Sequence, residues 1–265
     1  METGRKEHKL ISLLASRERL GVAFSGGADS SLLLHKAIEV LGPENVLVLT
    51  ARSRLLKKGD IENVSTWLTR HGHADVRHEF VDLDPLSWEE FVANPSDRCY
   101  RCKLRVYDAF FGRMREMGIS FLADGTNHDD MHSDRPGLRA LDELSVFTPL
   151  AEAELTKEEI RALGRACGLD TWDRPSASCL ATRIPAGLPV THIRLRLIDE
   201  IEAWLEDRGF SGCRARLDLH DPARLTLQLA EEDMVRLSSR EEREEHLRFF
   251  NDFGMKQVCL DLRGR

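Results

Sequence analysis

Short apolar runs alternate with longer amphipathic stretches through the first half of the chain. The run Leu20-Gly-Val-Ala-Phe24 is apolar and ends at glycines, which is typical of a strand buried on both faces. The next stretch places Leu33 and Leu41 near one helical face. We predict strands over residues 20–24, 46–50, 76–83 and 119–123, and helices over residues 5–17, 29–41, 58–71 and 103–117. The alternation predicts an α/β fold, a parallel sheet with helices on both faces.

The pattern changes past about residue 185. Residues 214–220 and 225–230 alternate apolar and polar positions and predict half-exposed antiparallel strands. Helices are predicted over residues 191–208 and 231–250, and a last strand over residues 257–262. Residues 173–189, rich in Pro, Ser and Gly, form a linker or a functional loop. We therefore predict a first domain over residues 1–185 and a small α+β domain over residues 186–265.

Length and charge bound the function. The 265 residues suffice for one large domain and a small one, each with a core. A formal net charge of −7 favours a small-molecule substrate over a nucleic acid, which needs Lys and Arg against its phosphates. No apolar run approaches the roughly 20 residues that span a bilayer, and the polar N-terminus is unlike a signal peptide. We expect a cytoplasmic protein that binds neither nucleic acid nor membrane.

A glycine turn lies between the first predicted strand and its helix. Gly26 and Gly27 allow a sharp turn and a close approach of N–H groups to an anion. The positive end of the helix dipole faces the same point. The hydroxyls that accompany the turn belong to Ser25, Ser30 and Ser31. The turn predicts a phosphate site, and the alternative is a plain glycine turn whose Asp or Ser caps the helix.

Asp29 is unexpected in an anion site because a carboxylate repels phosphate. It fits as a ligand of Mg²⁺ that bridges the phosphates. The turn is not a Walker A loop, since no Gly-Lys-Ser/Thr follows, and it is not a GxGxxG turn.

Two cysteines, Cys99 and Cys102, form a CxxC motif. The motif fits a redox pair, half of a zinc site or two ligands of an iron–sulfur cluster, and it also occurs by chance. Basic neighbours favour thiolates or hold an anionic substrate; they are Arg98, Arg101, Lys103 and Arg105.

A third cysteine, Cys179, lies among small, polar and proline residues, which indicates an exposed functional thiol; the alternative is a buried small residue. Together with the CxxC pair it suits a 4Fe–4S cluster with one open iron. A zinc site needs a further ligand such as His128 or His132. The other cysteines follow core patterns and are expected to be structural; they are Cys167, Cys213 and Cys259.

The turn from Ser25 to Ser30 resembles the PP-loop of the N-type ATP pyrophosphatases, which include GMP synthetase, NAD synthetase and tRNA thiolation enzymes. The resemblance implies an adenine nucleotide α-hydrolase-like fold. It also implies cleavage of ATP between the α and β phosphates and transfer of AMP to an oxygen of the substrate. The adenine is then expected near Thr50 and Ser53, with Gly125 at the same nucleotide site.

Further stretches narrow the resemblance to the LarE family of ATP-dependent sulfur transferases. They are Asp124-Gly-Thr-Asn-His-Asp-Asp130, Asp134-Arg-Pro-Gly-Leu-Arg-Ala140, Thr148-Pro-Leu150 and Pro175 to Pro185. The likeness runs from about residue 18 to about residue 230. It implies that ATP adenylates a carboxylate of pyridinium-3,5-biscarboxylate mononucleotide and that sulfur then displaces AMP. The thiocarboxylate product serves the nickel-pincer cofactor of lactate racemase.

The sulfur source separates two subgroups of this family. Members with a single cysteine sacrifice the sulfur of the residue equivalent to Cys179. Cys99 and Cys102 instead resemble the subgroup in which three cysteines hold a 4Fe–4S cluster that receives sulfide or another sulfur donor. Arginines that suit the substrate phosphate or carboxylates are Arg183, Arg214 and Arg216, although the last two also fit the solvated face of a strand. The resemblance implies a homo-oligomer.

Three other functions compete. A tRNA thiolation enzyme would use the same loop and a similar cluster, but it predicts a basic RNA-binding surface. An amide-forming ligase of the same superfamily leaves the three cysteines without a role. A nucleotide sensor would bind ATP without releasing pyrophosphate.

Overall fold

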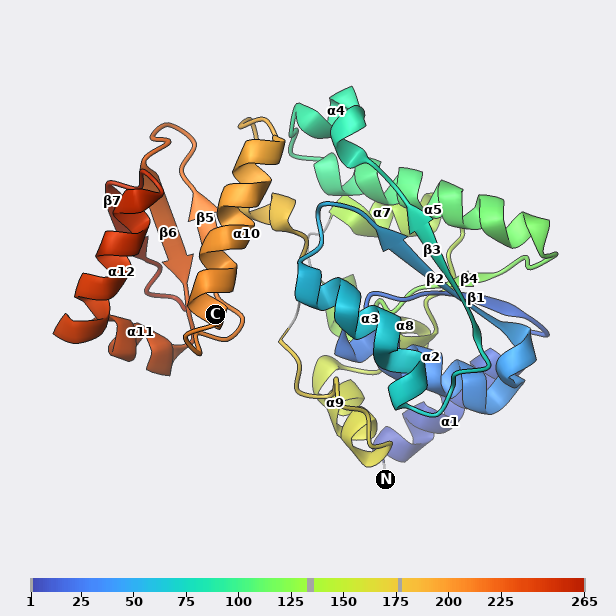
Figure 1. The fold of residues 1–265 in the computed structure, drawn as a ribbon. Helices are drawn as coiled ribbons and strands as arrows, with labels where there is room; N and C mark the ends of the chain where they lie inside the picture. Colours follow the sequence, from blue (N-terminus) through green and yellow to red (C-terminus); the bar gives the residue numbers. More distant parts are fainter. Residues whose placement is uncertain (1, 133–135, 176–177, 265) are drawn as a thin grey trace. The chain divides into compact units, whose positions relative to one another are not determined.

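The computed structural model describes residues 2–132, 136–175 and 178–264 (Figure 1). The chain forms two compact units. Unit 1 comprises Met1–Ser53, Lys58–Leu83 and Asp97–Ser176, and unit 2 comprises Arg54–Lys57, Asp84–Ser96 and Ala177–Arg265. Within two of the stretches that carry the family resemblance, residues 134–135 and 176–177 lie outside the described residues.

A parallel sheet in the order β3-β2-β1-β4 forms the centre of unit 1. Its strands are β1 (Leu20–Ala23), β2 (Val46–Arg52), β3 (Arg77–Asp82) and β4 (Leu122–Ala123). Leu20 pairs with Val46, and Gly21 pairs with Leu122, so β1 lies between β2 and β4. The predicted parallel α/β sheet is confirmed. The strand predicted over residues 119–123 is shorter than expected.

Helices cover both faces of this sheet (Figure 1). Val48 of β2 packs in a core with α1, α2 and α3, whereas Leu47 and Leu49 pack with α5 and α7 on the opposite face. Alternate residues of one strand thus serve two cores, which explains why the run is apolar throughout. The helices of unit 1 are α1 (Glu2–Ala15), α2 (Ala28–Leu41), α3 (Lys58–Arg70), α5 (Arg98–Glu116), α6 (His128–Met131), α7 (Pro136–Glu143), α8 (Pro149–Glu152) and α9 (Lys157–Ala166), with the 3-10 turn η1 (Pro43–Asn45).

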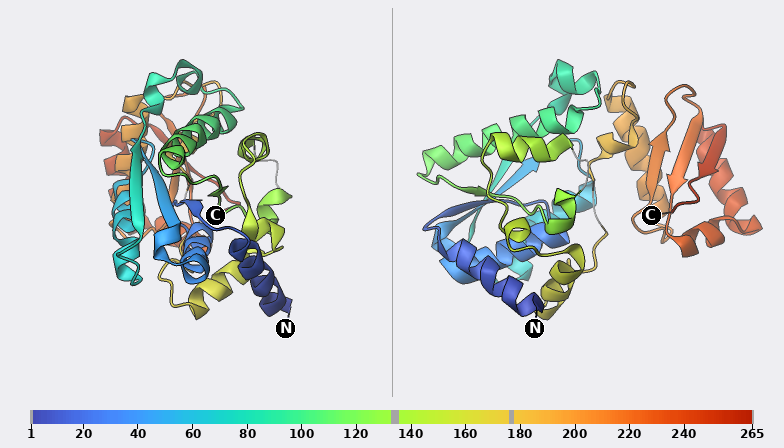
Figure 2. Two further views of the ribbon diagram at one scale, coloured as in Figure 1. Left: turned by 90° about the vertical axis from the view of Figure 1, so that its right-hand side faces the viewer. Right: turned by 180° about the vertical axis from the view of Figure 1, so that it is seen from behind.

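The N-terminal helix is tied to α9 in unit 1. Lys6 of α1 forms an ion pair with Glu159 of α9 at 2.8 Å. Glu159 also completes a capping box with Thr156, so α9 begins at a defined residue. Figure 2 shows α1 and α9 near the N-terminus.

Unit 2 contains a three-stranded sheet in the order β5-β6-β7. The strands are β5 (Arg214–Leu217), β6 (Arg224–Gln228) and β7 (Gln257–Leu260). β5 and β6 are antiparallel, as predicted, and β7 runs parallel to β6. The helical stretch predicted over residues 231–250 is two helices in the structure. The helical elements of unit 2 are η2 (Pro85–Ser87), α4 (Glu89–Val92), η3 (Leu180–Arg183), α10 (His192–Glu206), α11 (Glu231–Leu237) and α12 (Arg240–Asp252).

Aromatic and aliphatic side chains fill the core of unit 2. Leu205, Phe210 and Phe250 are buried there, and the ring of Trp204 stacks on Phe249 with 3.9 Å between centroids. Two segments from the first half of the chain, Arg54–Lys57 and Asp84–Ser96, also belong to this unit. The predicted domains, residues 1–185 and 186–265, assign these two segments to the first domain. The predicted boundary stays a prediction.

Across the described parts of the chain, no helix combines the length and apolar character needed to cross a membrane.

The core of unit 2 gives a first test of stability. Leu205 is fully buried, whereas Ile193 of the same helix is 79% exposed. Leu205→Ala should lower the free energy of unfolding by about 2–5 kcal/mol, because it removes buried apolar contacts and leaves a cavity. Ile193→Ala should change it by less than about 0.5 kcal/mol. Urea unfolding of both variants measures the difference, and equal losses would contradict the packing of α10.

Candidate functional site

The phosphate loop of unit 1 begins where β1 ends. Gly26 has a φ of 73°, a left-handed conformation that favours glycine. A Cβ atom there would lie 2.7 Å from both Asn63 Nδ2 and Val64 Cγ2. Any other residue at this position is therefore strained by its backbone and by its neighbours.

The N-terminus of α2 lacks a side-chain cap. Gly27 is the N-cap residue, and no side chain caps the helix by a hydrogen bond to its first N–H groups. The first N–H groups of an α-helix have no partner within the helix, so an uncapped end suits an anion. The alternative of a plain turn with an Asp or Ser cap does not describe this helix.

The serines of the loop divide into two kinds. Ser30 stabilises the loop: its hydroxyl lies 3.0 Å from that of Ser25, accepts from the Ser25 N–H at 3.3 Å and donates to the Gly27 carbonyl at 3.2 Å. Ser31 is fully buried, and its hydroxyl has no hydrogen-bond partner among the described residues. A buried hydroxyl without a partner is costly unless a ligand or water completes it.

Asp29 is half-buried in the first turn of α2. Burial raises the pKa of this carboxyl group above its usual value, and the nearby Asp130 adds to the rise, whereas Asn127, Lys157 and Arg161 oppose it. The surroundings thus disfavour the ionised form. A divalent cation would stabilise that form, so the carboxylate fits the predicted Mg²⁺ ligand.

Gly125 brings the end of β4 against the start of α2. A Cβ atom on Gly125 would lie 3.0 Å from Ser30 N and 3.1 Å from Ser30 Cα. The glycine permits this close approach of two backbones. Gly125 therefore lies beside the phosphate loop, and its contact with the nucleotide stays a prediction.

Asp124 is a candidate that the sequence analysis missed. Its carboxylate accepts hydrogen bonds from the Tyr107 hydroxyl and from the N–H and hydroxyl of Thr126, and it lies 3.4 Å from Lys103 Nζ. Burial opposes ionisation, but Lys103 and these hydrogen bonds lower the pKa of Asp124. The signal was available: an Asp directly after a predicted strand. Asp124 thereby ties the phosphate loop region to α5, the helix that carries the CxxC motif.

Thr50 lies within β2, two residues before the strand ends at Arg52, and Ser53 directly follows the strand. The Thr50 hydroxyl donates to the Phe24 carbonyl at 2.9 Å and lies 3.0 Å from His78 Nε2. The side chain is therefore engaged with its own sheet, and Ser53 is half-buried in the segment that follows. Their contact with adenine stays a prediction.

The CxxC motif occupies the first turn of α5. Cys99 is exposed, Cys102 is half-buried, and neither forms a disulfide. Residues three apart lie on one helical face, so the two thiols can bind one group. Among the residues that the structure describes, no three His, Cys, Asp or Glu side chains are grouped to hold a metal ion. The iron–sulfur and zinc interpretations both stay predictions.

Cys179 lies in unit 2 at the start of η3 and is half-buried. The next residue, Leu180, donates its N–H to the Leu55 carbonyl at 2.9 Å. Arg183, predicted to bind the substrate, is 4% exposed. Its guanidinium group donates to the Ser178 carbonyl at 2.7 Å and to Glu202 at 2.8 Å. Arg183 thus contacts the backbone of residues 178–183, the thiol turn, which carries Cys179.

The two arginines of β5 flank a buried residue. Ala215 is fully buried, and Arg214 and Arg216 on either side of it are half-buried and share the opposite face. Arg216 donates to the Thr182 carbonyl and to Gln228 Oε1, each at 2.8 Å. Arg216 therefore contacts the turn that carries Cys179 instead of extending into solvent.

The remaining cysteines match structural roles. Cys167 packs against the core of unit 1, and Cys213 is buried in unit 2. Burial raises the pKa of Cys213 to about 12, which makes it a poor nucleophile. Cys259 is half-buried on β7.

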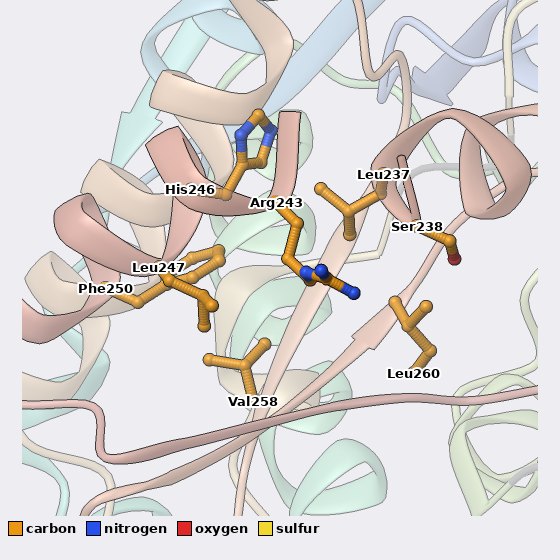
Figure 3. A pocket seen from close by; sticks show the side chains of 8 residues that line it. All are labelled: Leu237, Ser238, Arg243, His246, Leu247, Phe250, Val258 and Leu260. Carbon is orange, nitrogen blue, oxygen red and sulfur yellow. The ribbon is translucent and has the colours of Figure 1, made fainter. Parts of the chain in front are cut away.

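Unit 2 also contains an apolar cavity of about 190 Å³ between α12 and β7 (Figure 3). In Figure 3 the Arg243 guanidinium lies among Leu237, Val258 and Leu260, while the ring of His246 points away from them. No predicted site residue lines this cavity. Its apolar wall does not suit a charged pyridinium substrate.

The parallel sheet and the glycine loop before α2 define the class: this is an α/β protein with the PP-loop fold. No protein-family model matches the chain. The chain is 31% identical over 98% of its length to the pyridinium-3,5-bisthiocarboxylic acid mononucleotide synthase of Lactiplantibacillus plantarum, of which it covers 91%. An uncharacterised protein of Synechocystis is 31% identical over 98% of this chain and 94% of that protein.

A more distant relative is the glutamine-hydrolysing GMP synthase of Bdellovibrio bacteriovorus. It is 28% identical and matches 68% of this chain but only 39% of its own length. The resemblance predicted from the loop and the Cys179 segment is confirmed. The chain belongs to the LarE family, that of the pyridinium-3,5-bisthiocarboxylic acid mononucleotide synthase.

The two loop glycines make a matched pair for mutation. Gly26→Ala should destabilise the protein by about 1–3 kcal/mol, because φ is positive and the new Cβ has no room. Gly27 has a φ of −84°, and its Cβ would meet only Ser25 Oγ at 3.7 Å, so Gly27→Ala should be nearly neutral for stability. Thermal unfolding without nucleotide measures both. A larger loss for Gly27→Ala would contradict the loop conformation.

His78 gives a pH dependence. Burial lowers its pKa to about 4, below the value of about 6.5 in the unfolded chain. The unfolded state therefore binds the proton first, and the stability that His78 contributes above about pH 6.5 is lost as pH falls toward about 4. When the pH is lowered from about 7 to about 5, the free energy of unfolding should fall in the parent protein by on the order of 1 kcal/mol more than in His78→Gln, which has no imidazole to protonate. Urea unfolding at both pH values tests this, with the exposed His8→Gln as control; equal losses in all three proteins would refute it.

Proposed function

We propose that the chain is an ATP-dependent sulfur transferase that converts a carboxylate of pyridinium-3,5-biscarboxylate mononucleotide into a thiocarboxylate. The product would serve a nickel-pincer cofactor of the lactate racemase type. The observation that carries the proposal is the 31% identity over 98% of the chain to a synthase whose name states the bisthiocarboxylic acid product. The uncapped glycine loop supports the ATP half of the reaction.

Adenylation is the first half of the proposed reaction. A carboxylate oxygen attacks the α-phosphorus of ATP, the bond to the bridging oxygen breaks, and pyrophosphate leaves. The N–H groups at the start of α2 would stabilise charge on the phosphates, and Asp29 would hold Mg²⁺. Ser25 and Ser31 would donate further hydrogen bonds, while Ser30, which donates to the Gly27 carbonyl, would keep the loop in shape.

Sulfur transfer is the second half. A sulfide attacks the acyl carbon of the adenylate, the carbon–oxygen bond breaks, and AMP leaves with that oxygen. The thiocarboxylate remains on the substrate. Because AMP is a far better leaving group than oxide, adenylation makes this exchange possible at neutral pH.

The thiols Cys99, Cys102 and Cys179 are proposed to hold a 4Fe–4S cluster, which when bound supplies the sulfide. Cys99 and Cys102 fit as two of its ligands: neither is in a disulfide, and they lie about one helical turn apart at the positive end of α5. Cys179 would be the third ligand and not a sacrificial donor.

The arginines divide between binding and support. Arg214 and Arg216 lie on one face of β5 and would bind the phosphate or the carboxylates of the substrate. Arg183 is buried, and its guanidinium group is occupied by Glu202 and the Cys179 turn. We therefore propose a supporting role for Arg183 in place of direct substrate contact.

The test uses anaerobically purified protein. We expect about four irons per chain, and AMP and pyrophosphate formed in equal amounts with the pyridinium substrate and sulfide. Cys99→Ala should abolish both the iron and the sulfide-dependent turnover, whereas Cys167→Ala should preserve them.

Other outcomes select a rival. Iron-free protein that loses the sulfur of Cys179 once per product would support the sacrificial route. AMP formation that needs tRNA would support tRNA thiolation. ATP binding without pyrophosphate release under any of these conditions would contradict the proposed reaction.

A further inference from the structure

Glu202 of α10 is a fully buried carboxylate on which two cations converge. Arg183 donates to both of its oxygens, from Nε at 2.8 Å and from Nη2 at 3.1 Å. Lys57 Nζ lies 2.6 Å from it, and the Ala215 N–H donates at 2.9 Å. The carboxylate therefore joins three separate segments of unit 2 to helix α10.

The first of these segments is the turn that carries Cys179. Arg183, held by Glu202, donates from Nη1 to the Ser178 carbonyl at 2.7 Å and to the Cys179 carbonyl at 3.2 Å. The Thr182 hydroxyl also donates to the Cys179 carbonyl, at 2.8 Å. The backbone on both sides of the Cys179 side chain is thus fixed by groups that depend on Glu202.

The second segment is Arg54–Lys57, which follows β2 in the chain. Leu55 accepts the N–H of Leu180 at 2.9 Å, directly after the thiol. Lys57 bridges Glu202 and Glu206 at 2.6 Å and 2.7 Å. Lys57 therefore holds the segment Arg54–Lys57 in place. Leu55, in the same segment, contacts the thiol turn.

The third segment is β5. The Ala215 N–H is bound to Glu202, and the flanking Arg216 contacts the Thr182 carbonyl. The Glu202 carboxylate therefore contacts groups that hold both the thiol turn and β5, the strand with the candidate substrate-binding residues Arg214 and Arg216.

Energy alone does not explain such a buried network. Removing two or more charges from water costs nearly as much as their attraction returns, and apolar replacements are often as stable. What the network does supply is geometry: a bidentate Arg–carboxylate pair fixes direction as well as distance. Burial opposes ionisation, but Arg183 and Lys57 lower the pKa of Glu202 and keep it charged at neutral pH.

We infer that Glu202 is a positioning residue, which acts through Arg183 and Lys57 to hold the backbone on both sides of Cys179 in one conformation. Its effect on turnover rests on the proposed sulfur transfer. Its effect on the Cys179 turn does not, and can be measured on the metal-free protein.

The experiment compares Glu202→Gln with Glu206→Gln. Both variants lose a carboxylate that contacts Lys57, but Glu206 is 37% exposed and makes no contact with Arg183 among the described residues. The rate of iodoacetamide alkylation is measured at Cys179 by peptide mass spectrometry on the full-length, metal-free protein, with Cys99 as internal standard. We expect alkylation at Cys179 to rise roughly tenfold in Glu202→Gln and less than about twofold in Glu206→Gln.

A kinetic readout separates positioning from general damage. In Glu202→Gln the sulfide-dependent formation of product should fall roughly tenfold at saturating substrate, while exchange of pyrophosphate into ATP at saturating substrate, which uses the loop of unit 1, should stay within about twofold. The KM for the substrate should rise in both assays, because Glu202 also holds β5. If Glu202→Gln does not fold, Arg183→Lys replaces it, because Lys keeps the charge but cannot fork; the same rise in alkylation is expected.

Unchanged alkylation at Cys179 in a folded Glu202→Gln or Arg183→Lys variant would overturn the inference. Equal increases in Glu202→Gln and Glu206→Gln would overturn it as well, because the effect would then come from Lys57 alone. If the parent protein shows no AMP formation, the proposed function fails, but the alkylation result still decides the role of Glu202.

Discussion

Unit 1 depends on one steric constraint: at Gly26, between β1 and α2, and at Gly125, after β4, the backbone passes so close to its neighbours that a side chain has no room. Gly26 faces α3 through Asn63 and Val64, and Gly125 lies against the backbone of Ser30. Because these contacts fix the loop, α2 starts at one place with its N–H groups uncapped. The proposed anion site is therefore formed by the backbone, and the serines and Asp29 lie around it.

The turn around Cys179 is held in a different way. Backbone sterics fix the phosphate loop, whereas buried charges fix the thiol turn, through Glu202, Arg183 and Lys57. The difference suits the two halves of the proposed reaction. Fixed backbone N–H groups bind phosphates well. A thiol has to be oriented by the groups around it, and here these are side chains, not a glycine loop.

The sequence predicted the features that depend on local pattern. Buried strands, the glycine loop and the CxxC motif could be found because each leaves a signal within a few residues, as in Leu20-Gly-Val-Ala-Phe24. Contacts between distant residues leave no such signal. The place of Arg54–Lys57 in unit 2, the network around Asp124 and the pairing of Arg183 with Glu202 could not be predicted. Arg183 shows the consequence: its residue type suggested a ligand contact, but its partner lies nineteen positions away.

The central claim is that ATP activates a carboxylate of the substrate before sulfur replaces one of its oxygens. The most direct measurement uses pyridinium substrate whose carboxylate oxygens carry a heavy isotope. After turnover with sulfide, mass spectrometry of the AMP should show one labelled oxygen per molecule, since that oxygen formed the bond to the α-phosphorus. Unlabelled AMP, or ADP in place of AMP, would contradict the claim.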